Sequence, residues 1–203
     1  MAVIVVGGHS RNIGKTSVVA GLIAHLPEFR WTAFKITQYG HGFCTVDGKP
    51  CKCQTEDSCV SLSAELDPAS GTDTSRFLAA GAARSIWVRT RIGMLAEAMP
   101  RIEKELAASE NAILESNSIL EFLTPDLYLT VLDPAVEDFK NSARRFLDRA
   151  DAVLISSSDP AEETQATAHD EKPLFWVPPP DYISAELVDF VRARLAPQVA
   201  AVS

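Results

Sequence analysis

The sequence begins with a short apolar run that leads directly into a glycine-containing loop. Residues 2–6 are apolar and rich in β-branched side chains, as is typical of a strand buried on both faces of a parallel sheet. The loop reads Gly8-His9-Ser10-Arg11-Asn12-Ile13-Gly14-Lys15-Thr16. Apolar residues at helical spacing then follow from Thr16 to Leu26, and Pro27 ends the predicted helix. This order of strand, glycine turn and helix constrains the fold more than any other feature of the chain.

A loop of this kind at the amino end of a helix is suited to binding phosphate. Its glycines allow backbone N–H groups to point at phosphate oxygens, and the helix dipole favours negative charge there. We expect Lys15 to reach the β- and γ-phosphates of a nucleotide and the Thr16 hydroxyl to ligate Mg²⁺. The alternative is a chance Gly-Lys-Thr at a tight turn, which the strand–loop–helix context disfavours. The predicted cofactor-binding residues are Gly8, His9, Ser10, Arg11, Asn12, Ile13, Gly14, Lys15, Thr16 and Ser17.

Strand and helix patterns alternate along the rest of the chain. This alternation predicts an α/β fold with a doubly wound, mostly parallel sheet of about seven strands flanked by helices. The expected strands cover residues 2–6, 31–37, 85–89, 112–115, 127–132, 152–155 and 174–177. The expected helices cover 16–26, 74–83, 93–108, about 139–149, and 184–195. The length favours a single nucleotide-binding domain over residues 1–203.

Charge and hydropathy exclude some partners. The chain has 19 Lys and Arg against 27 Asp and Glu, and this acid excess disfavours a nucleic-acid partner that needs a broad basic face. Its apolar runs are far shorter than the roughly 18–20 residues that span a bilayer, and its start lacks the basic region of a secretory signal. We therefore expect a cytoplasmic protein that binds neither nucleic acid nor membrane.

Two acidic residues lie where a sheet of this type places its site, beyond the carboxyl ends of strands. Glu115 ends an apolar strand, and Asp73 begins the helix that follows a long loop. Because Mg²⁺ prefers octahedral oxygen geometry and takes few protein ligands, we predict Thr16, Asp73 and Glu115 as its ligands. Asp73 could instead cap its helix, and Glu115 could be a solvated acid at a strand end.

Other polar residues are secondary candidates for the site. Lys35 lies near the end of an apolar strand, where it should face the ligand crevice or pair with an acid. Arg76 could add positive charge for a phosphoryl group or lie on a helix surface. Asp159 has the spacing of the aspartate in the guanine-reading Asn-Lys-x-Asp motif, without its Asn and Lys, so it does not distinguish ATP from GTP. The proline run at 178–180 could line the same base pocket.

All four cysteines fall in one short window, at Cys44, Cys51, Cys53 and Cys59. Four thiolates in one loop suit a tetrahedral Zn²⁺ site or an iron–sulfur cluster, and His41 is a further candidate ligand. Zinc is the leading expectation because nothing in the sequence demands redox chemistry. Free thiols or one disulfide are the alternative. The window lies in a segment of about residues 40–71 without periodicity, which we interpret as an insertion with a function or a cross-link of its own.

The phosphate loop resembles those of known families. Five residues separate Gly8 from Gly14, as in dethiobiotin synthetase and the cobyrinic acid amide synthases, and the run from Asn12 to Thr16 is similar to accessory protein B of molybdopterin-guanine dinucleotide biosynthesis. Residues 72–76, followed by Ala-Gly-Ala at 80–82, also resemble a stretch of that accessory protein. Residues 112–115 resemble the strand in both families that delivers a glutamate near metal or phosphate. The cysteine segment has no counterpart in these families.

The resemblance to dethiobiotin synthetase implies an NTP hydrolase or NTP-dependent ligase that uses ATP or GTP with Mg²⁺ on a small molecule in cofactor biosynthesis. The reaction would be carboxylate or carbamate activation, with Lys15, Lys35 and Glu115 as catalytic residues and Lys35 facing the substrate. The resemblance to accessory protein B implies instead a GTP-binding protein, non-catalytic or slowly hydrolysing, with a protein partner. A third hypothesis is a metal-responsive module in which the nucleotide drives a switch. A homodimer is a further expectation from resemblance.

Overall fold

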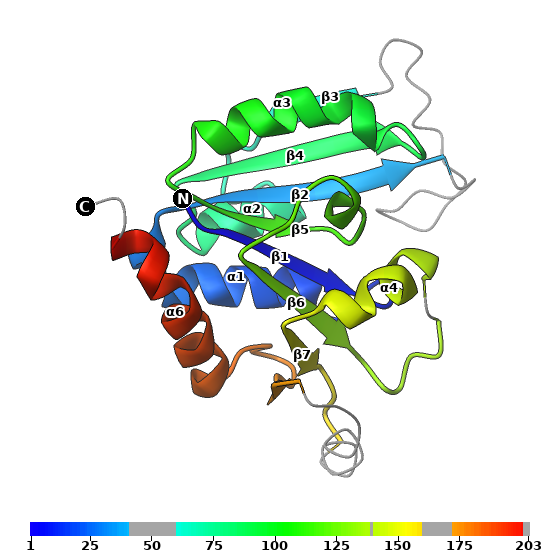
Figure 1. Cartoon of the computed structure of the whole chain (residues 1–203), viewed down its shortest axis with the longest axis vertical. Coiled ribbons are helices and arrows are strands. Elements are labelled where there is room, and N and C mark those ends of the chain that lie inside the picture. The colour runs from blue at the N-terminus through cyan, green and yellow to red at the C-terminus, as the bar shows by residue number, and fades with distance from the viewer. Residues whose placement is uncertain (41–59, 139, 160–171, 201–203) are drawn as a thin grey trace.

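The computed structural model of the chain describes residues 1–40, 60–138, 140–159 and 172–200. These residues form an eight-stranded sheet with helices on both of its faces (Figure 1). His41 and the four cysteines lie outside the described residues, so the predicted zinc or iron–sulfur site stays a prediction. No helix in the described ranges is long and apolar enough to cross a membrane.

The sheet is parallel except at one edge. Its strand order is β3-β4-β2-β5-β1-β6-β7-β8, and only β3 runs antiparallel to its neighbour. The strands are β1 (Val3–Gly8), β2 (Trp31–Tyr39), β3 (Val60–Ala64), β4 (Arg84–Arg91), β5 (Asn111–Glu115), β6 (Leu127–Leu132), β7 (Ala152–Ile155) and β8 (Leu174–Trp176). This arrangement confirms the predicted α/β fold with a doubly wound, mostly parallel sheet.

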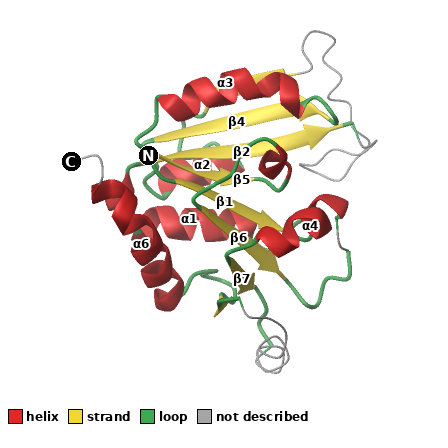
Figure 2. Ribbon diagram, in the orientation of Figure 1, coloured by secondary structure: helices red, strands yellow, loops and turns green. Residues whose placement is uncertain are grey.

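Helices cover the sheet in two layers (Figure 2). Helices α1 (Lys15–His25), α2 (Asp73–Ala79) and α6 (Ala185–Ala200) lie on one face, while α3 (Leu95–Ala107) and α4 (Asn141–Phe146) lie on the other. Short 3₁₀ turns are η1 (Pro27–Phe29), η2 (Ser118–Glu121) and η3 (Leu147–Arg149). Strand β1 packs against both helix layers, because Ile4 and Val6 belong to one core cluster and Val5 to the other. A strand buried on both faces needs the continuous apolar run that the sequence has.

Two expectations are corrected by the strand and helix bounds. The sheet has eight strands, not about seven, because residues 60–64 of the segment predicted to lack periodicity form β3. The sequence Val-Ser-Leu-Ser-Ala alternates apolar and polar side chains there, which is the pattern of a half-exposed strand. The helix expected near 139–149 is shorter, since α4 ends at Phe146 and the chain continues as η3.

Candidate functional site

The loop between β1 and α1 is held in place by distant parts of the chain. The backbone N–H of His9 donates to Val131 O on β6 at 3.2 Å, and His9 O accepts from Lys140 N at 2.9 Å. On its other side, the Ser156 hydroxyl after β7 donates to Ile13 O at 2.9 Å. His9 is only 2% exposed, so it serves as a buried support of the loop.

Asn117, which follows β5, fixes the end of β1. Its side-chain amide accepts from Gly8 N at 2.9 Å and donates to Gly8 O at 2.8 Å. Both backbone hydrogen-bonding groups of Gly8 therefore have a partner. A Cβ on Gly7 would lie 2.1 Å from Asn117 Oδ1, which explains why a glycine stands there. Sequence reasoning missed this role. The available signal was an amide side chain directly after a buried strand.

Gly14 closes the loop beneath an aromatic ring. Its φ of 88° lies in the left-handed region that favours glycine, and a Cβ there would be 2.2 Å from Cδ1 of Tyr182. Tyr182 follows β8 and lines the cleft described below. The sequence suggested that residues 178–180 could line the base pocket, but they are not among the residues that line the cleft, and Tyr182 was missed. Asp159 does not line the cleft either.

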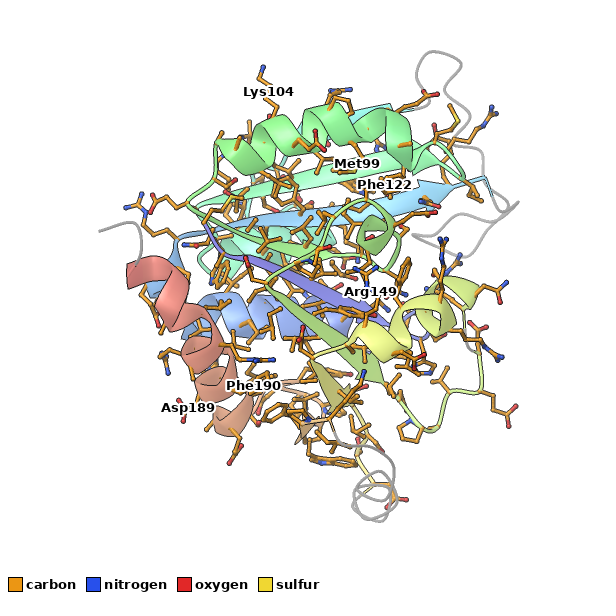
Figure 3. All side chains as sticks on the ribbon, in the orientation of Figure 1. Met99, Lys104, Phe122, Arg149, Asp189 and Phe190 are labelled. Carbon is orange, nitrogen blue, oxygen red and sulfur yellow. The ribbon has the colours of Figure 1, made fainter. Side chains whose placement is uncertain are left out.

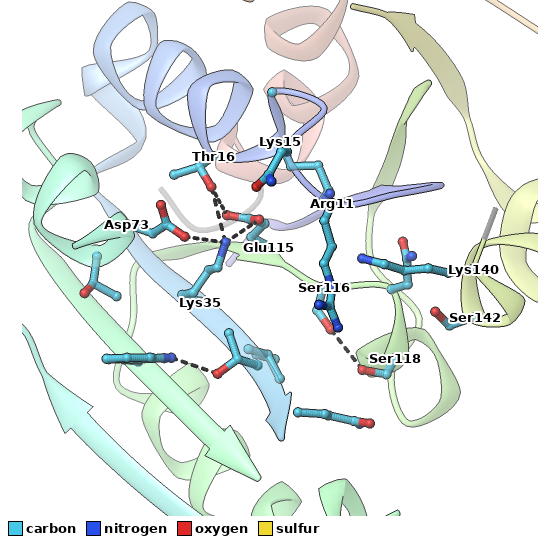
Figure 4. A pocket seen from close by; sticks show the side chains of 18 of the residues that line it. Arg11, Lys15, Thr16, Lys35, Asp73, Glu115, Ser116, Ser118, Lys140 and Ser142 are labelled. Carbon is cyan, nitrogen blue, oxygen red and sulfur yellow. Dashed lines mark hydrogen bonds and ion pairs between the residues drawn. The ribbon is translucent and has the colours of Figure 1, made fainter. Parts of the chain in front are cut away.

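Four predicted site residues meet at the foot of the loop (Figure 4). The Nζ atom of Lys35 lies 2.5 Å from Glu115 Oε1, 2.8 Å from Asp73 Oδ2 and 3.2 Å from Thr16 Oγ1. The Thr16 hydroxyl in turn donates to Glu115 Oε2 at 2.8 Å. Lys35 and Glu115 are register partners on β2 and β5, which places their side chains next to each other. The residues therefore come from α1, β2, α2 and β5.

The structure contradicts the alternative roles considered for the two acids, a helix cap for Asp73 and a solvated strand end for Glu115. The Glu115 side chain is 5% exposed and paired, so it is not a solvated acid. Thr72, not Asp73, is the N-cap of α2, because its hydroxyl accepts from Ser75 N at 3.0 Å. Asp73 is the first helical residue, and its carboxylate is left to pair with Lys35.

Glu65 organises the turn that carries Asp73 into the site. Its carboxylate accepts hydrogen bonds from the Thr72, Ser70 and Thr74 hydroxyls and from two backbone N–H groups, those of Leu66 and Asp67. The Thr72 hydroxyl, foremost among these donors, helps to lower the pKa of Glu65 to about 2. Sequence reasoning missed this residue, because an isolated acid in a polar segment carries no pattern.

Three lysines face this region with altered proton affinity. Burial lowers the pKa of Lys15 to about 8, against the opposing effect of Glu115, and the Lys15 ammonium donates to Ser10 O. Burial likewise lowers the pKa of Lys140 to about 8, and nearby Arg11 adds to this effect. Burial opposes the charged form of Lys35 as well, but the carboxylates of Glu115 and Asp73 outweigh it and raise its pKa. The site therefore holds positive charge that anions would stabilise.

These groups line a cleft of about 1200 Å³ at the carboxyl edge of the sheet. Of the predicted cofactor-binding residues, the cleft is lined by Arg11, Asn12, Gly14, Lys15, Thr16 and Ser17, whereas the buried side of the loop consists of Gly8, His9, Ser10 and Ile13. Arg76 faces the cleft too, since its guanidinium donates to Ser17 Oγ at 2.8 Å.

The donor set at the foot of the loop suits a hard cation. Thr16, Asp73 and Glu115 offer a hydroxyl and two carboxylates, and Mg²⁺ takes few protein ligands and the remainder from phosphates and water. Among the residues that the structure describes, no group of three or more His, Cys, Asp and Glu side chains is arranged to hold a metal by itself. A metal here would therefore depend on the hydroxyl and on a bound ligand.

Solved structures of other proteins are similar to this chain in fold. LpxK from Aquifex aeolicus, solved in complex with ATP, is 18% identical with a TM-score of 0.51, and the match covers 87% of this chain and 53% of LpxK. The chain has the fold of the P-loop NTPases. It spans about half the length of the LpxK chain. HypB from Helicobacter pylori, solved with nickel, is 16% identical with a TM-score of 0.46, covering 96% of this chain and 86% of HypB. MobB from Bacillus subtilis is 16% identical with a TM-score of 0.41, covering 94% of this chain and 96% of MobB.

These similarities concern the fold. No protein-family model matches the sequence, and no curated protein matches it. The resemblance to dethiobiotin synthetase and to accessory protein B therefore stays a prediction from the phosphate loop.

Proposed function

We propose that the chain binds a nucleoside triphosphate with Mg²⁺ in this cleft and uses it to activate a small molecule. The observation that carries the proposal is the convergence of oxygen atoms from Thr16, Asp73 and Glu115 at the foot of the glycine loop. The fold shared with LpxK, which was solved with ATP, supports a nucleotide as the ligand.

Each residue has a role that follows from its position. The backbone N–H groups at the start of α1 bind phosphate oxygens, and Lys15 adds a charge-assisted hydrogen bond. Thr16, Asp73 and Glu115 would hold Mg²⁺, which would supply positive charge against the negative charge of the phosphates. Lys35 contacts the same three oxygens in this structure, so it would have to give them up when the metal binds, and its ammonium group would then be available to the phosphates or the substrate.

The size of the cleft favours a second molecule beside the nucleotide. The lining extends past the glycine loop to Thr37 and Trp87 on the central strands and to Ser118 after β5. A reaction of the dethiobiotin synthetase type, in which a carboxylate or carbamate is activated by phosphoryl transfer, fits such a cleft. In phosphoryl transfer the protein mainly positions the reactants and stabilises charge, and Lys15 and Lys35 supply that charge.

The test of nucleotide binding is a comparison of two lysine variants. Isothermal titration of ATP and of GTP with Mg²⁺ into Lys15→Ala should give an affinity lower by roughly 10- to 100-fold, as expected for the loss of a hydrogen bond to a charged group. Lys104→Ala removes an exposed lysine from the outer side of α3 and should bind as the unaltered chain does. Equal affinities for both variants would overturn the proposal.

A second measurement tests turnover. Phosphate release with ATP or GTP should rise when a small carboxylic or amino compound that serves as substrate is added. Release that is slow and indifferent to every such compound would favour the non-catalytic accessory protein over the enzyme.

A further inference from the structure

The part of the cleft farthest from Asp73 carries two cations to which the proposed function above assigns no role. Arg11 extends from the glycine loop, and Lys140 precedes α4 on the opposite wall (Figure 4). Within the part of the chain that the structure describes, neither side chain has a hydrogen-bond or ion-pair partner. The nearby acid, Asp138, accepts instead from the Ser10 hydroxyl at 3.0 Å.

Serine hydroxyls line the same cleft as the two cations. The Oγ atoms of Ser116 and Ser118 lie 3.3 Å apart at the start of η2, and both residues line the cleft together with Arg11 (Figure 4). Ser142 adds a third hydroxyl from α4. Hydroxyls and a guanidinium are the donors that recognise carboxylate and phosphate oxygens, and the planar guanidinium matches two of them at once.

We propose that this end of the cleft binds an oxyanion, a carboxylate or phosphate group carried by the second substrate, through Arg11, Lys140 and the neighbouring serine hydroxyls. The inference rests on the proposed nucleotide-dependent function and specifies its substrate class. Trp87 and Ile92 also line the cleft, so the substrate is a small organic anion with an apolar portion.

The direction of Arg11 separates this group from the phosphates of the nucleotide. The Lys15 ammonium donates to Ser10 O and so stays at the glycine loop, whereas the side chain of Arg11 extends away from Lys15 in the view of Figure 4. The pKa of Lys140 is lowered to about 8 by burial and by Arg11, which supports the same reading, because an anion between the two cations would relieve both effects.

The experiment titrates succinate and inorganic phosphate into the full chain saturated with Mg²⁺ and a non-hydrolysable triphosphate analogue. We expect millimolar binding of at least one anion and an affinity at least tenfold lower in Lys140→Met. Ser118→Ala should weaken binding less, because it removes an uncharged donor. Lys104→Met is the matched control, since Lys104 projects away from the sheet (Figure 3), and it should bind as the unaltered chain does.

A second arm identifies the site of the anion. Affinities of Lys140→Met for the triphosphate analogue and for the diphosphate should equal those of the unaltered chain. A selective loss of triphosphate affinity would show that Lys140 contacts the terminal phosphate and would overturn the inference. So would an absence of anion binding, or binding that Lys15→Ala abolishes and Lys140→Met preserves. Failure of the analogue to bind would contradict the proposed function instead, and the same anion titrations on the free chain would still test Lys140.

Proton uptake gives a readout that a merely structural role would not alter. Near pH 8 about half of Lys140 is protonated in the free chain, so an anion that raises its pKa draws in up to about half a proton. Anion affinity should fall as the pH rises above 8. Titration in two buffers of different ionisation enthalpy measures the uptake, which Lys140→Met should remove. The charges that act on Lys140 come from Arg11, Lys15, Lys35, Glu115 and Asp138.

Discussion

One ammonium group, that of Lys35, balances the two carboxylates at the foot of the glycine loop. Its side chain is 14% exposed and that of Glu115 is 5% exposed, so water screens their attraction poorly. Lys35 contacts both carboxylates and so offsets the repulsion between their negative charges. Lys35 thus keeps Asp73 and Glu115 ready for a metal in the chain that has no nucleotide.

Replacing Lys35 should reveal that balance. Lys35→Met leaves Glu115 buried without its partner, so the free energy of unfolding should fall by about 3 kcal/mol. Added Mg²⁺ should restore part of the loss, because the vacated oxygens can then bind the ion. Urea unfolding with and without MgCl₂ measures both effects. Stability equal to that of the Lys104→Met control would contradict the role of Lys35.

Two features require glycine at position 14, its positive φ and its close contact with Tyr182, and experiments can distinguish their effects. Gly14→Ala should lower the free energy of unfolding through its positive φ and through contact with Tyr182. Gly81→Ala has the same kind of positive φ, 103°, with no atom within 4 Å, so it reports the backbone strain alone, roughly 1–2 kcal/mol. In a chain that already carries Tyr182→Ala, the further change Gly14→Ala should lower the free energy of unfolding only by the amount seen for Gly81→Ala. Equal Tm values for the two single variants would argue against the Tyr182 contact.

Local patterns named Lys15 and Thr16 from the loop motif, and Lys35 and Glu115 from their places near strand ends. The structure brings Thr16, Lys35 and Glu115 into contact, while their roles in binding and catalysis stay predictions. Asn117 and Tyr182 were missed because each acts on the loop from more than 100 residues away, and no local pattern records such a contact.

At the level of elements, strand β3 was missed from the sequence, because residues 40–71 were expected to lack periodic structure. Its alternation of apolar and polar side chains is a strand signal, but it lies in a segment rich in glycine, proline and cysteine. As an antiparallel edge strand it buries less than the central strands, so its apolar content is low. The pairing with β4 supplies its remaining stabilisation, and that pairing is invisible in the local sequence.

The turn before α2 is the element that Glu65 controls. Glu65→Ala removes the acceptor shared by Thr72 and Ser70, so amide hydrogen exchange should become faster across residues 66–75. Mg²⁺-dependent nucleotide affinity should fall as well, because Asp73 begins this helix. Glu97→Ala, on the exposed side of α3, is the control and should change neither quantity.

Acid should weaken the same turn only at very low pH. The folded pKa of Glu65, about 2, lies below its ordinary value of 4.5, so its contribution is complete above pH 4.5 and is lost as the pH falls through 2. A titration of the Glu65 carboxyl carbon by NMR measures this directly. A midpoint near 4.5 would contradict the hydrogen-bond network.

For the whole molecule, the fold class was predictable because strand and helix patterns alternate along the chain. The order of the strands was not, since each pairing joins residues far apart in sequence. The proposed ligand should stabilise the folded chain by mass action. At 100 times its dissociation constant, a Mg²⁺-nucleotide adds about 2.7 kcal/mol, which raises the Tm of a chain of this size by about 5–10 °C. Thermal unfolding should show this shift, and Lys15→Ala should reduce it.

The position of β1 within the sheet has a consequence for synthesis on the ribosome. This strand precedes all other strands of the sheet in the chain, yet its neighbours β5 and β6 begin only at Asn111 and Leu127, and the glycine loop also needs Lys140 and Ser156. Residues as far along as β6 and Ser156 must therefore leave the ribosome before β1 and the glycine loop acquire their native contacts. Nascent chains halted before β6 should have no nucleotide affinity, and the ability to bind phosphate should arise late and in one step.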